Sequence, residues 1–284
     1  MTGEAGTDAP TRLAASLRDV AVTVAREAAE LVRTTTATRG VEVAATKSSA
    51  VDVVTEADRA SERLLRRRLA ELRPGDGVLG EEEGDVAGTT GVRWVVDPVD
   101  GTVNLLYGIP EYAVSVAAEV DGVVVAGAVV DVPHGHTHAA ARGLGATRDG
   151  VPLRVRPTVP VPQRLVLTGF GYLAEVRAHQ GACVARLLPR VRDVRRLGSC
   201  ALDLCHVAAG LADAYVEQGP RPWDWAAGSL VVEEAGGRFA RLPGLGPEEP
   251  GTGAPSPVLV AGPADGFDEL VGLLAETGFL AVVE

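Results

Sequence analysis

A short hydrophobic run that ends in two closely spaced carboxylates constrains this chain more than any other feature. Residues 92–96 read as a buried β-strand, and Asp-Pro-Val-Asp-Gly-Thr follows at residues 97–102. Because proline cannot donate to a β-ladder, we expect the strand to end at Asp97-Pro98 in a turn. Two carboxylates at i and i+3 beyond a strand can converge on one hard cation. The segment predicts a metal site, although Asp, Pro and Gly also favour an ordinary turn.

The two residues that follow the second carboxylate predict an anion site beside this cation. Gly101 allows a ligand to approach the backbone closely, and Thr102 is expected to begin a helix, whose free N–H groups favour phosphate. The chain carries 27 basic and 38 acidic residues, a net charge of -11. This charge repels nucleic acids and anionic membranes, so we expect neither as a partner. An anionic substrate would need bound cations.

Helices and strands alternate along the rest of the chain. A helix is expected from Leu13 onwards, and Thr55 is expected to cap a second helix that ends before Pro74-Gly75. Asp121-Gly122 predicts a type I′ hairpin turn between strands at 113–120 and 123–132. Further strands are expected at 136–141, 166–169, 191–195, 212–217 and 258–261, and further helices at 173–188, 200–209, 223–235 and 267–274.

The 284 residues fit one large domain built from two packed halves. Residues 1–10 are small and polar and predict a disordered tail. A proline-punctuated stretch at 151–161 predicts a boundary between halves at 11–160 and 161–284. No apolar run reaches the ~20 residues of a membrane span, and no signal-peptide pattern is present. We therefore expect a cytoplasmic protein.

Four motifs resemble signatures of the inositol monophosphatase family. The first is W-x-x-D-P-x-D-G-T-x-N at residues 94–104, with Leu105 where the family often has Phe, a packing difference. The others lie at 222–228 with 234–237, at 80–82, and at 47–49 with 52–58. They follow the family's order and cover the chain from about residue 13. The resemblance implies an α+β fold, a layered α/β/α/β/α sandwich of the inositol monophosphatase and fructose-1,6-bisphosphatase type.

The resemblance also implies two to three Mg²⁺ ions, for which Mn²⁺ can substitute. It assigns Glu81, Asp97 and the backbone carbonyl of Val99 to the first ion, and Asp97, Asp100 and Asp224 to the second. Glu81 would also bind a third, weaker ion. Independently, carboxylates that share a pocket raise one another's pKa unless cations neutralise them. Ligand sets made only of oxygen favour Mg²⁺ or Mn²⁺ over zinc.

By the same resemblance, Asp58 pairs with Thr102 to orient the attacking water, and Glu81 assists the chemistry. Asp58 could instead be a carboxylate that stabilises a helix start by ~0.5 kcal/mol. An acidic run such as Glu81 to Glu83 is usually a solvated loop, and we assign Glu83 to that role. Gly101 and Thr102 would bind the phosphate through their backbone amides.

Glu217 matches the family position that accepts hydrogen bonds from substrate hydroxyls, although it could be an ordinary acid at a strand end. Asp100 and Asp224 would also contact substrate. Cys200 is expected to form a wall of the polyol pocket rather than a nucleophile, because no basic neighbour lowers its pKa. With Cys183 and Cys205 it forms no C-x-x-C pair that would indicate a disulfide or zinc site.

The histidines at 134, 136 and 138 would share one face of a strand, but they match no ligand position of the family, so we do not interpret them as a metal site.

The resemblance implies a phosphatase that hydrolyses inositol 1-phosphate, or a similar small polyol phosphate, by metal-activated water. Val103 stands where nucleotide-specific relatives tend to carry Lys. Histidinol phosphate is the alternative substrate. The family also implies lithium sensitivity and a homodimer. A binding or regulatory protein that kept the fold is the alternative from another class, but all the predicted acidic ligands and Thr102 are present.

Overall fold

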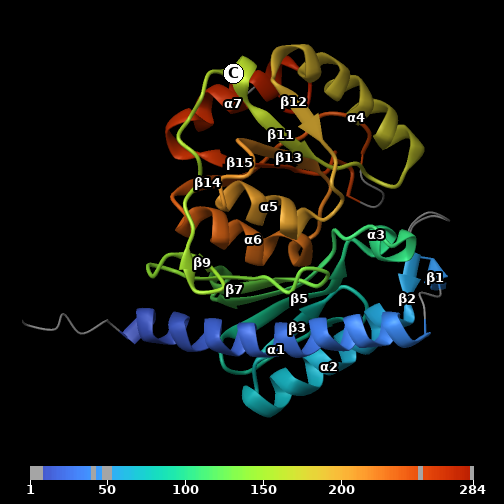
Figure 1. Ribbon diagram of the computed structural model, residues 1–284, viewed down its shortest axis with the longest axis vertical. Helices are drawn as coiled ribbons and strands as arrows, with labels where there is room; N and C mark the ends of the chain where they lie inside the picture. The colour runs from blue at the N-terminus through green and yellow to red at the C-terminus, as the bar shows by residue number, and fades with distance from the viewer. Residues whose placement is uncertain (1–8, 40–42, 47–52, 249–251, 282–284) are drawn as a thin grey trace, which may run out of the picture.

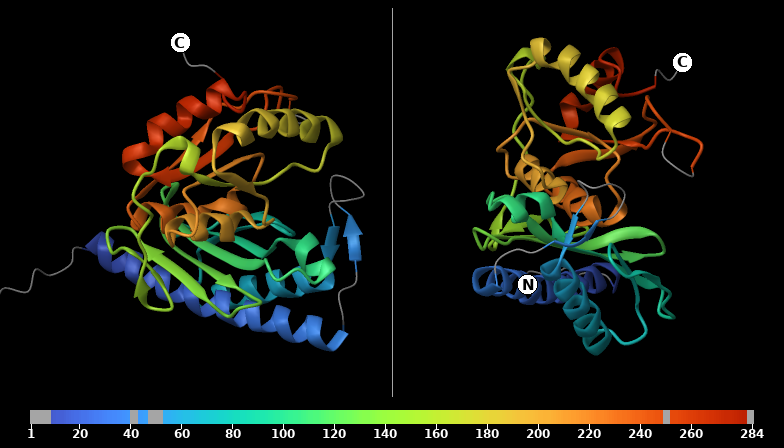
Figure 2. Two further views of the ribbon diagram at one scale, coloured as in Figure 1. Left: turned by 45° about the horizontal axis from the view of Figure 1, so that its top comes forward. Right: turned by 90° about the vertical axis from the view of Figure 1, so that its right-hand side faces the viewer.

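The computed structural model describes residues 9–39, 43–46, 53–248 and 252–281, and these stack in five alternating layers of helices and sheets (Figure 1). The order of the layers confirms the predicted α/β/α/β/α sandwich, and the two further views show the same stacking (Figure 2). The outer layers are α1 (Ala9–Arg39) with α2 (Glu56–Leu72), and α4 (Ala174–Leu187) with α7 (Phe267–Glu276); the central layer is α5 (Cys200–Ala208) with α6 (Pro222–Glu234).

Two sheets separate the helical layers. The eight-stranded sheet has the order β10-β9-β8-β7-β6-β5-β3-β4, and the five-stranded sheet has the order β12-β11-β13-β15-β14. The first comprises β3 (Gly77–Gly80), β4 (Gly84–Val86), β5 (Val92–Asp100), β6 (Ala113–Val120), β7 (Val123–Asp131), β8 (Thr137–Ala141), β9 (Ala146–Arg148) and β10 (Val151–Pro152). The second comprises β11 (Leu165–Thr168), β12 (Asp193–Arg195), β13 (Ala214–Gln218), β14 (Gly237–Leu242) and β15 (Val258–Pro263). A small separate pair is formed by β1 (Val43–Thr46) and β2 (Val53–Thr55).

The two N-terminal helices form where the sequence predicts them. In α1, Leu17, Ala21, Val24 and Ala28 recur at helical spacing and are fully buried against the first sheet. Thr55 caps α2 in a capping box with Asp58, which confirms the predicted cap. Because α1 begins at Ala9, only residues 1–8 of the expected tail remain, and they lie outside the described residues. None of the helices that the structure describes is long and apolar enough to cross a bilayer.

The hairpin between β6 and β7 also confirms its prediction. Asp121 and Gly122 have φ angles of 51° and 78°, the pair of positive values that a type I′ turn requires.

The course of β5 corrects the predicted end of the strand at Asp97-Pro98. The strand continues to Asp100, because a β-bulge accommodates Pro98. Asp97 lies opposite Ser115 and Asp100 lies opposite Ala113. An advance of three residues along β5 therefore corresponds to only two residues along β6, which defines the bulge. The two carboxylates therefore flank a bulge within one strand.

Small residues set the distance between the first sheet and the central helices. Ala113 and Ala117 of β6 are fully buried in the core that contains α6. At Gly127 of β7, an added Cβ would lie 2.9 Å from the Cα of Ala227 in α6. In addition, the hydroxyl of Ser115 donates to the carbonyl of Trp223, 3.2 Å away. This close approach fixes the distance between the first turn of α6 and the first sheet.

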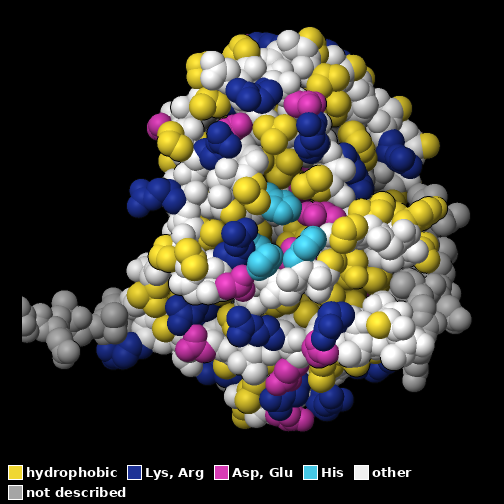
Figure 3. Space-filling model, viewed as in Figure 1, with side chains coloured by type: hydrophobic (Ala, Val, Ile, Leu, Met, Phe, Trp, Pro, Cys, Tyr) yellow, Lys and Arg dark blue, Asp and Glu magenta, His cyan; other side chains and the backbone are white. Residues whose placement is uncertain are grey.

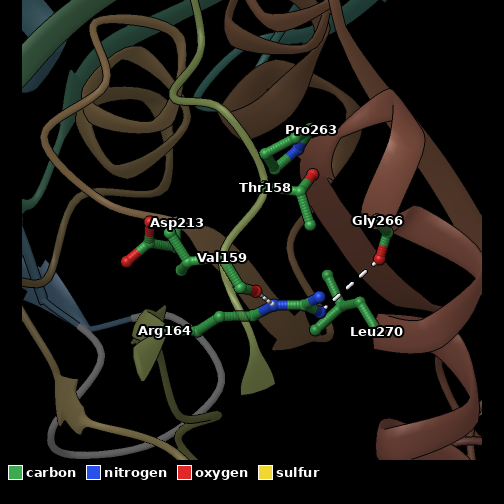
Figure 4. Close-up of a pocket in the computed structure, with 7 residues that line it drawn as sticks. All are labelled: Thr158, Val159, Arg164, Asp213, Pro263, Gly266 and Leu270. Carbon is green, nitrogen blue, oxygen red and sulfur yellow. Dashed lines mark hydrogen bonds between the residues drawn. The ribbon is translucent and has the colours of Figure 1, made fainter. Parts of the chain in front are cut away.

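Residues 153–160 connect the first sheet to the second, and the side chain of Arg164 holds this connection in place through hydrogen bonds (Figure 4). Its Nε donates to the carbonyl of Val159 at 2.9 Å, and its Nη1 lies 3.5 Å from the carbonyl of Gly266. The adjoining hollow measures about 10 Å³, room for about one water molecule. It is a packing feature rather than a ligand site.

Candidate active site

A cleft of about 540 Å³ lies where the end of β5 and α3 (Thr102–Tyr107) meet the second sheet and α6. The predicted site residues that line it are Glu81, Asp97, Val99, Asp100, Gly101, Thr102, Cys200, Glu217 and Asp224. The remaining predicted residue, Asp58, contacts the cleft through Thr102. The structure thus brings together residues that are more than a hundred positions apart in the sequence.

Three carboxylates form the centre of the cleft. Oxygen atoms of Asp97, Asp100 and Asp224 lie within 4.8 Å of one another. Burial, followed by the charges of Glu81, Asp100 and Asp224, raises the pKa of Asp97 well above its ordinary value. Burial and the charges of Asp100 and Glu81 likewise raise the pKa of Asp224. These carboxylates repel one another, and a hard divalent cation with oxygen ligands fits their donor set.

Asp100 and Asp224, the two half-buried carboxylates, both accept hydrogen bonds from neighbouring loop and helix residues. Asp224 lies in the first turn of α6, where its Oδ2 accepts from the backbone N–H of Arg221 at 2.5 Å. The Oδ2 of Asp100 accepts from the Ser199 hydroxyl and from the Ala201 N–H, both at 2.6 Å. Burial raises the pKa of Asp100 to about 6 despite these two donors. The backbone N–H of Cys200 also contributes to lowering the pKa of Asp100.

Thr102 and Asp58 form a hydrogen-bonded pair at the start of α3. The Thr102 hydroxyl lies 2.8 Å from Asp58 Oδ1 and 3.0 Å from the carbonyl of Val99. Asp58 is fully buried, and its Oδ2 accepts from the backbone N–H of Thr55 at 2.9 Å. One oxygen of Asp58 therefore caps α2, and the other accepts a hydrogen bond from Thr102.

Gly101 precedes α3 with a φ of 96°, which few other residues adopt without strain. A Cβ at this position would lie 2.8 Å from the carbonyl oxygen of Glu111. The helix begins at Thr102, as the sequence predicts, and it contains six residues.

Glu217 lines the cleft near the end of β13. The Tyr215 hydroxyl lies 2.9 Å from Glu217 Oε2 and 3.0 Å from the Cys200 sulfur. Burial raises the pKa of Glu217 to about 7, although Tyr215 and Arg196 counteract it. Burial also raises the pKa of the Cys200 thiol well above its ordinary value, which does not fit a nucleophile.

Two cations and a tyrosine that contribute to this site were not predicted from the sequence. Arg196 and Arg221 line the cleft, and the charge of Arg196 lowers the pKa of Asp100 and of Glu217. Arg221 directly precedes the matched motif at 222–228, which is the signal that could have found it, whereas Arg196 lies in none of the matched motifs. Tyr215 lies in none of the matched motifs, so nothing in the sequence singled it out. The matched residues 47–49 and 52 lie outside the described residues.

Two of the three closely spaced histidines pair with different aspartates, and the third is buried. His134 and His136 precede β8 rather than lying on it, which corrects their expected arrangement on one strand face. The Nδ1 of His134 is 2.9 Å from Asp131 Oδ2, and the Nδ1 of His136 is 2.7 Å from Asp149 Oδ2. His138 is buried within β8.

The sequence matches the model of the inositol monophosphatase family over residues 14–270. It is 52% identical over 237 residues to an inositol-1-monophosphatase of Mycobacterium leprae, covering 78% of this chain and 81% of that protein. It is 38% identical over 221 residues to the Nus factor SuhB of Escherichia coli, covering 77% and 82%. The solved structure of Mycobacterium tuberculosis SuhB is similar with a TM-score of 0.78 and 44% identity, covering 94% and 98% of the two chains.

Proposed function

Because this chain belongs to the inositol monophosphatase family, a family of metal-dependent phosphatases, we propose that it hydrolyses inositol 1-phosphate or a similar small polyol phosphate with Mg²⁺. One observation carries the proposal: three carboxylates within 4.8 Å border a cleft of about 540 Å³. They come from both halves of the chain, Asp97 and Asp100 from β5 and Asp224 from α6. We therefore propose that residues 11–284 work as a single catalytic domain.

The proposed ligands of the ions are Glu81, Asp97, Asp100 and Asp224 with the carbonyl of Val99. The raised pKa values of Asp97 and Asp224 support this assignment, because burial and the charges of Glu81 and Asp100 raise them, and a divalent cation would offset this buried negative charge. When bound, two to three Mg²⁺ ions, or Mn²⁺ in their place, would supply positive charge to the phosphate oxygens and acidify a nearby water.

Thr102 and Asp58 are proposed to orient that water. If the Thr102 hydroxyl donates its proton to Asp58 Oδ1 at 2.8 Å, the lone pairs of Thr102 Oγ1 can accept a hydrogen bond from the water. Asp58 is held by Thr55 and cannot turn away. The pair would thereby direct the water at phosphorus and attract its proton during in-line attack.

The phosphate would bind the backbone amides of Gly101 and Thr102, with added charge from Arg196. The alcohol part of the substrate would then face Glu217, whose Oε2 is oriented by the Tyr215 hydroxyl. A carboxylate here accepts hydrogen bonds from the hydroxyls of a polyol. It would equally pair with the amine of histidinol phosphate, which remains the second candidate substrate for this reason.

A phosphate-release assay separates the candidates. We would supply inositol 1-phosphate, histidinol phosphate, fructose 1,6-bisphosphate and 3′-phosphoadenosine 5′-phosphate with Mg²⁺, with EDTA, and with Mg²⁺ plus millimolar lithium. We expect the highest kcat/KM for inositol 1-phosphate, no turnover in EDTA and inhibition by lithium. Full activity in EDTA would refute the metal assignment, and a preference for histidinol phosphate would refute the substrate assignment.

The Escherichia coli relative is named a Nus factor, and a binding role is therefore the second candidate function. We favour an enzyme because every predicted acidic ligand is present and lines one cleft. Absence of turnover on all four substrates would support the binding role instead.

A further inference from the structure

A second group of ligand-type side chains lies outside the cleft and takes no part in the proposed reaction. Glu111 precedes β6, while Asp203 and His206 lie one turn apart on α5. Each offers one ligand atom, and these atoms lie within 4.8 Å of one another. The Nδ1 of His206 is 3.6 Å from an oxygen of Glu111, which is too far for a good hydrogen bond.

The polar atoms of this group are buried and unsatisfied. Both carboxylate oxygens of Asp203, Oε1 of Glu111 and Nδ1 of His206 have no hydrogen-bond partner in the part of the chain that the structure describes. The exposed fraction of Asp203 is 0%. Buried polar atoms in folded proteins are almost always paired, so four unpaired atoms around one point call for a missing partner. Neighbouring Asp131 is already bound by His134.

We propose that Glu111, Asp203 and His206 bind a divalent transition-metal ion such as Zn²⁺. Two carboxylates and one imidazole suit such an ion, whereas Mg²⁺ and Ca²⁺ prefer oxygen ligands alone. Three protein ligands and one water would complete the tetrahedral geometry that Zn²⁺ prefers. The side chains of His206 and Glu111 are 20% and 18% exposed, so an ion can enter from solvent. Histidine and acidic side chains gather in the middle of the face shown in Figure 3.

The ion would connect the two halves of the chain beside the cleft. Glu111 belongs to the loop before β6, and its carbonyl accepts from the side-chain amide of Asn104 at 2.7 Å. The same amide lies 2.9 Å from the carbonyl of Leu197, shortly before α5. An ion bound to Glu111 and to α5 would reinforce this junction. We therefore assign it a stabilising role rather than a catalytic one.

The test uses the full-length protein labelled with ¹⁵N in its five histidines and saturated with Mg²⁺ to occupy the cleft. One equivalent of ZnCl₂ should shift a single imidazole signal, which His206→Gln removes. His206→Gln should also bind one Zn²⁺ fewer by calorimetry and lose the rise in Tm that Zn²⁺ gives. The control His136→Gln, an exposed histidine paired with Asp149, should behave as the wild type.

An imidazole shift at His134 or His136, or equal Zn²⁺ stoichiometry in wild type and His206→Gln, would overturn the proposal. If His206→Gln fails to fold, Glu111→Gln serves as the second variant, because Glu111 lies in a loop. It should likewise abolish the imidazole shift. The readout is independent of turnover, and an imidazole signal cannot arise from the cleft, whose proposed ligands are all oxygen atoms.

Discussion

Replacing Asp100 by Asn should stabilise the metal-free protein while abolishing its activity. Burial raises the pKa of Asp100 to about 6, against about 3.9 for an unfolded aspartate. Because the folded state holds this proton more tightly, the metal-free protein loses stability as the pH rises from about 4 through 6. Above that range the ionised group costs about 3 kcal/mol. Asn carries no charge and removes this cost.

The hydrogen bonds of Asp100 indicate how well Asn can replace it. Both donors, Ser199 and Ala201, bind Oδ2, so the single oxygen of Asn can accept from both. The amide group would then take the place of Oδ1 and face the other two carboxylates. Losing the charge weakens the two hydrogen bonds by about 1 kcal/mol. The net gain is about 1–2 kcal/mol, a rise in Tm of about 2–8 °C for a chain of this size.

Calorimetry in EDTA at pH 7.5 measures the Tm, and phosphate release with Mg²⁺ measures the activity. Asp85→Asn is the matched control, because Asp85 is exposed on β4 and lies 3.6 Å from Arg93. It should leave both readouts nearly unchanged. A clear fall in the Tm of Asp100→Asn would refute the electrostatic argument. A rate at least half that of the wild type would refute the assignment of Asp100 as a ligand.

Three further predictions concern single residues. Glu217→Gln should lower kcat/KM for inositol 1-phosphate about 10- to 100-fold but affect a simple alkyl phosphate far less; equal losses would place Glu217 in the metal site or the fold. Thr102→Val should lower kcat about 10²- to 10⁴-fold with little change in KM, and Thr102→Ser should restore it; a normal kcat in the valine variant would exclude a role in orienting water. Burial lowers the pKa of His138 to about 4, so the free energy of unfolding of the wild type relative to His138→Gln, measured with urea in EDTA, should fall by about 3 kcal/mol from pH 6.5 to pH 4; a difference that stays constant with pH would contradict this.

Elements with strong local signals could be predicted from the sequence. Thr55 marks a helix start through its side chain, and Asp121-Gly122 marks a turn through its backbone. These signals act within a few residues, so they do not depend on the rest of the fold. The family motifs likewise identified the residues that meet in the cleft.

Features that depend on distant partners were not predicted. The edge strand β14 was missed because its alternating residues, from Gly237 to Leu242, become a strand only by pairing with β15. The bulge in β5 depends on the register with β6. Arg196 reaches the cleft, and Glu111 reaches His206, only through tertiary packing.

The contact between Gly127 and Ala227 makes the active site sensitive to packing outside it. Asp224 lies one turn before Ala227 on α6, whereas Asp97 and Asp100 belong to the sheet beneath that helix. One layer of small side chains lies between α6 and the sheet. Its thickness thus determines the distance between Asp224 and the two carboxylates of β5. A single methyl group at position 127 would lift the helix by tenths of an ångström and change the size of cation that the carboxylates can enclose. Ion selectivity would in this way be encoded in residues that never touch the ion.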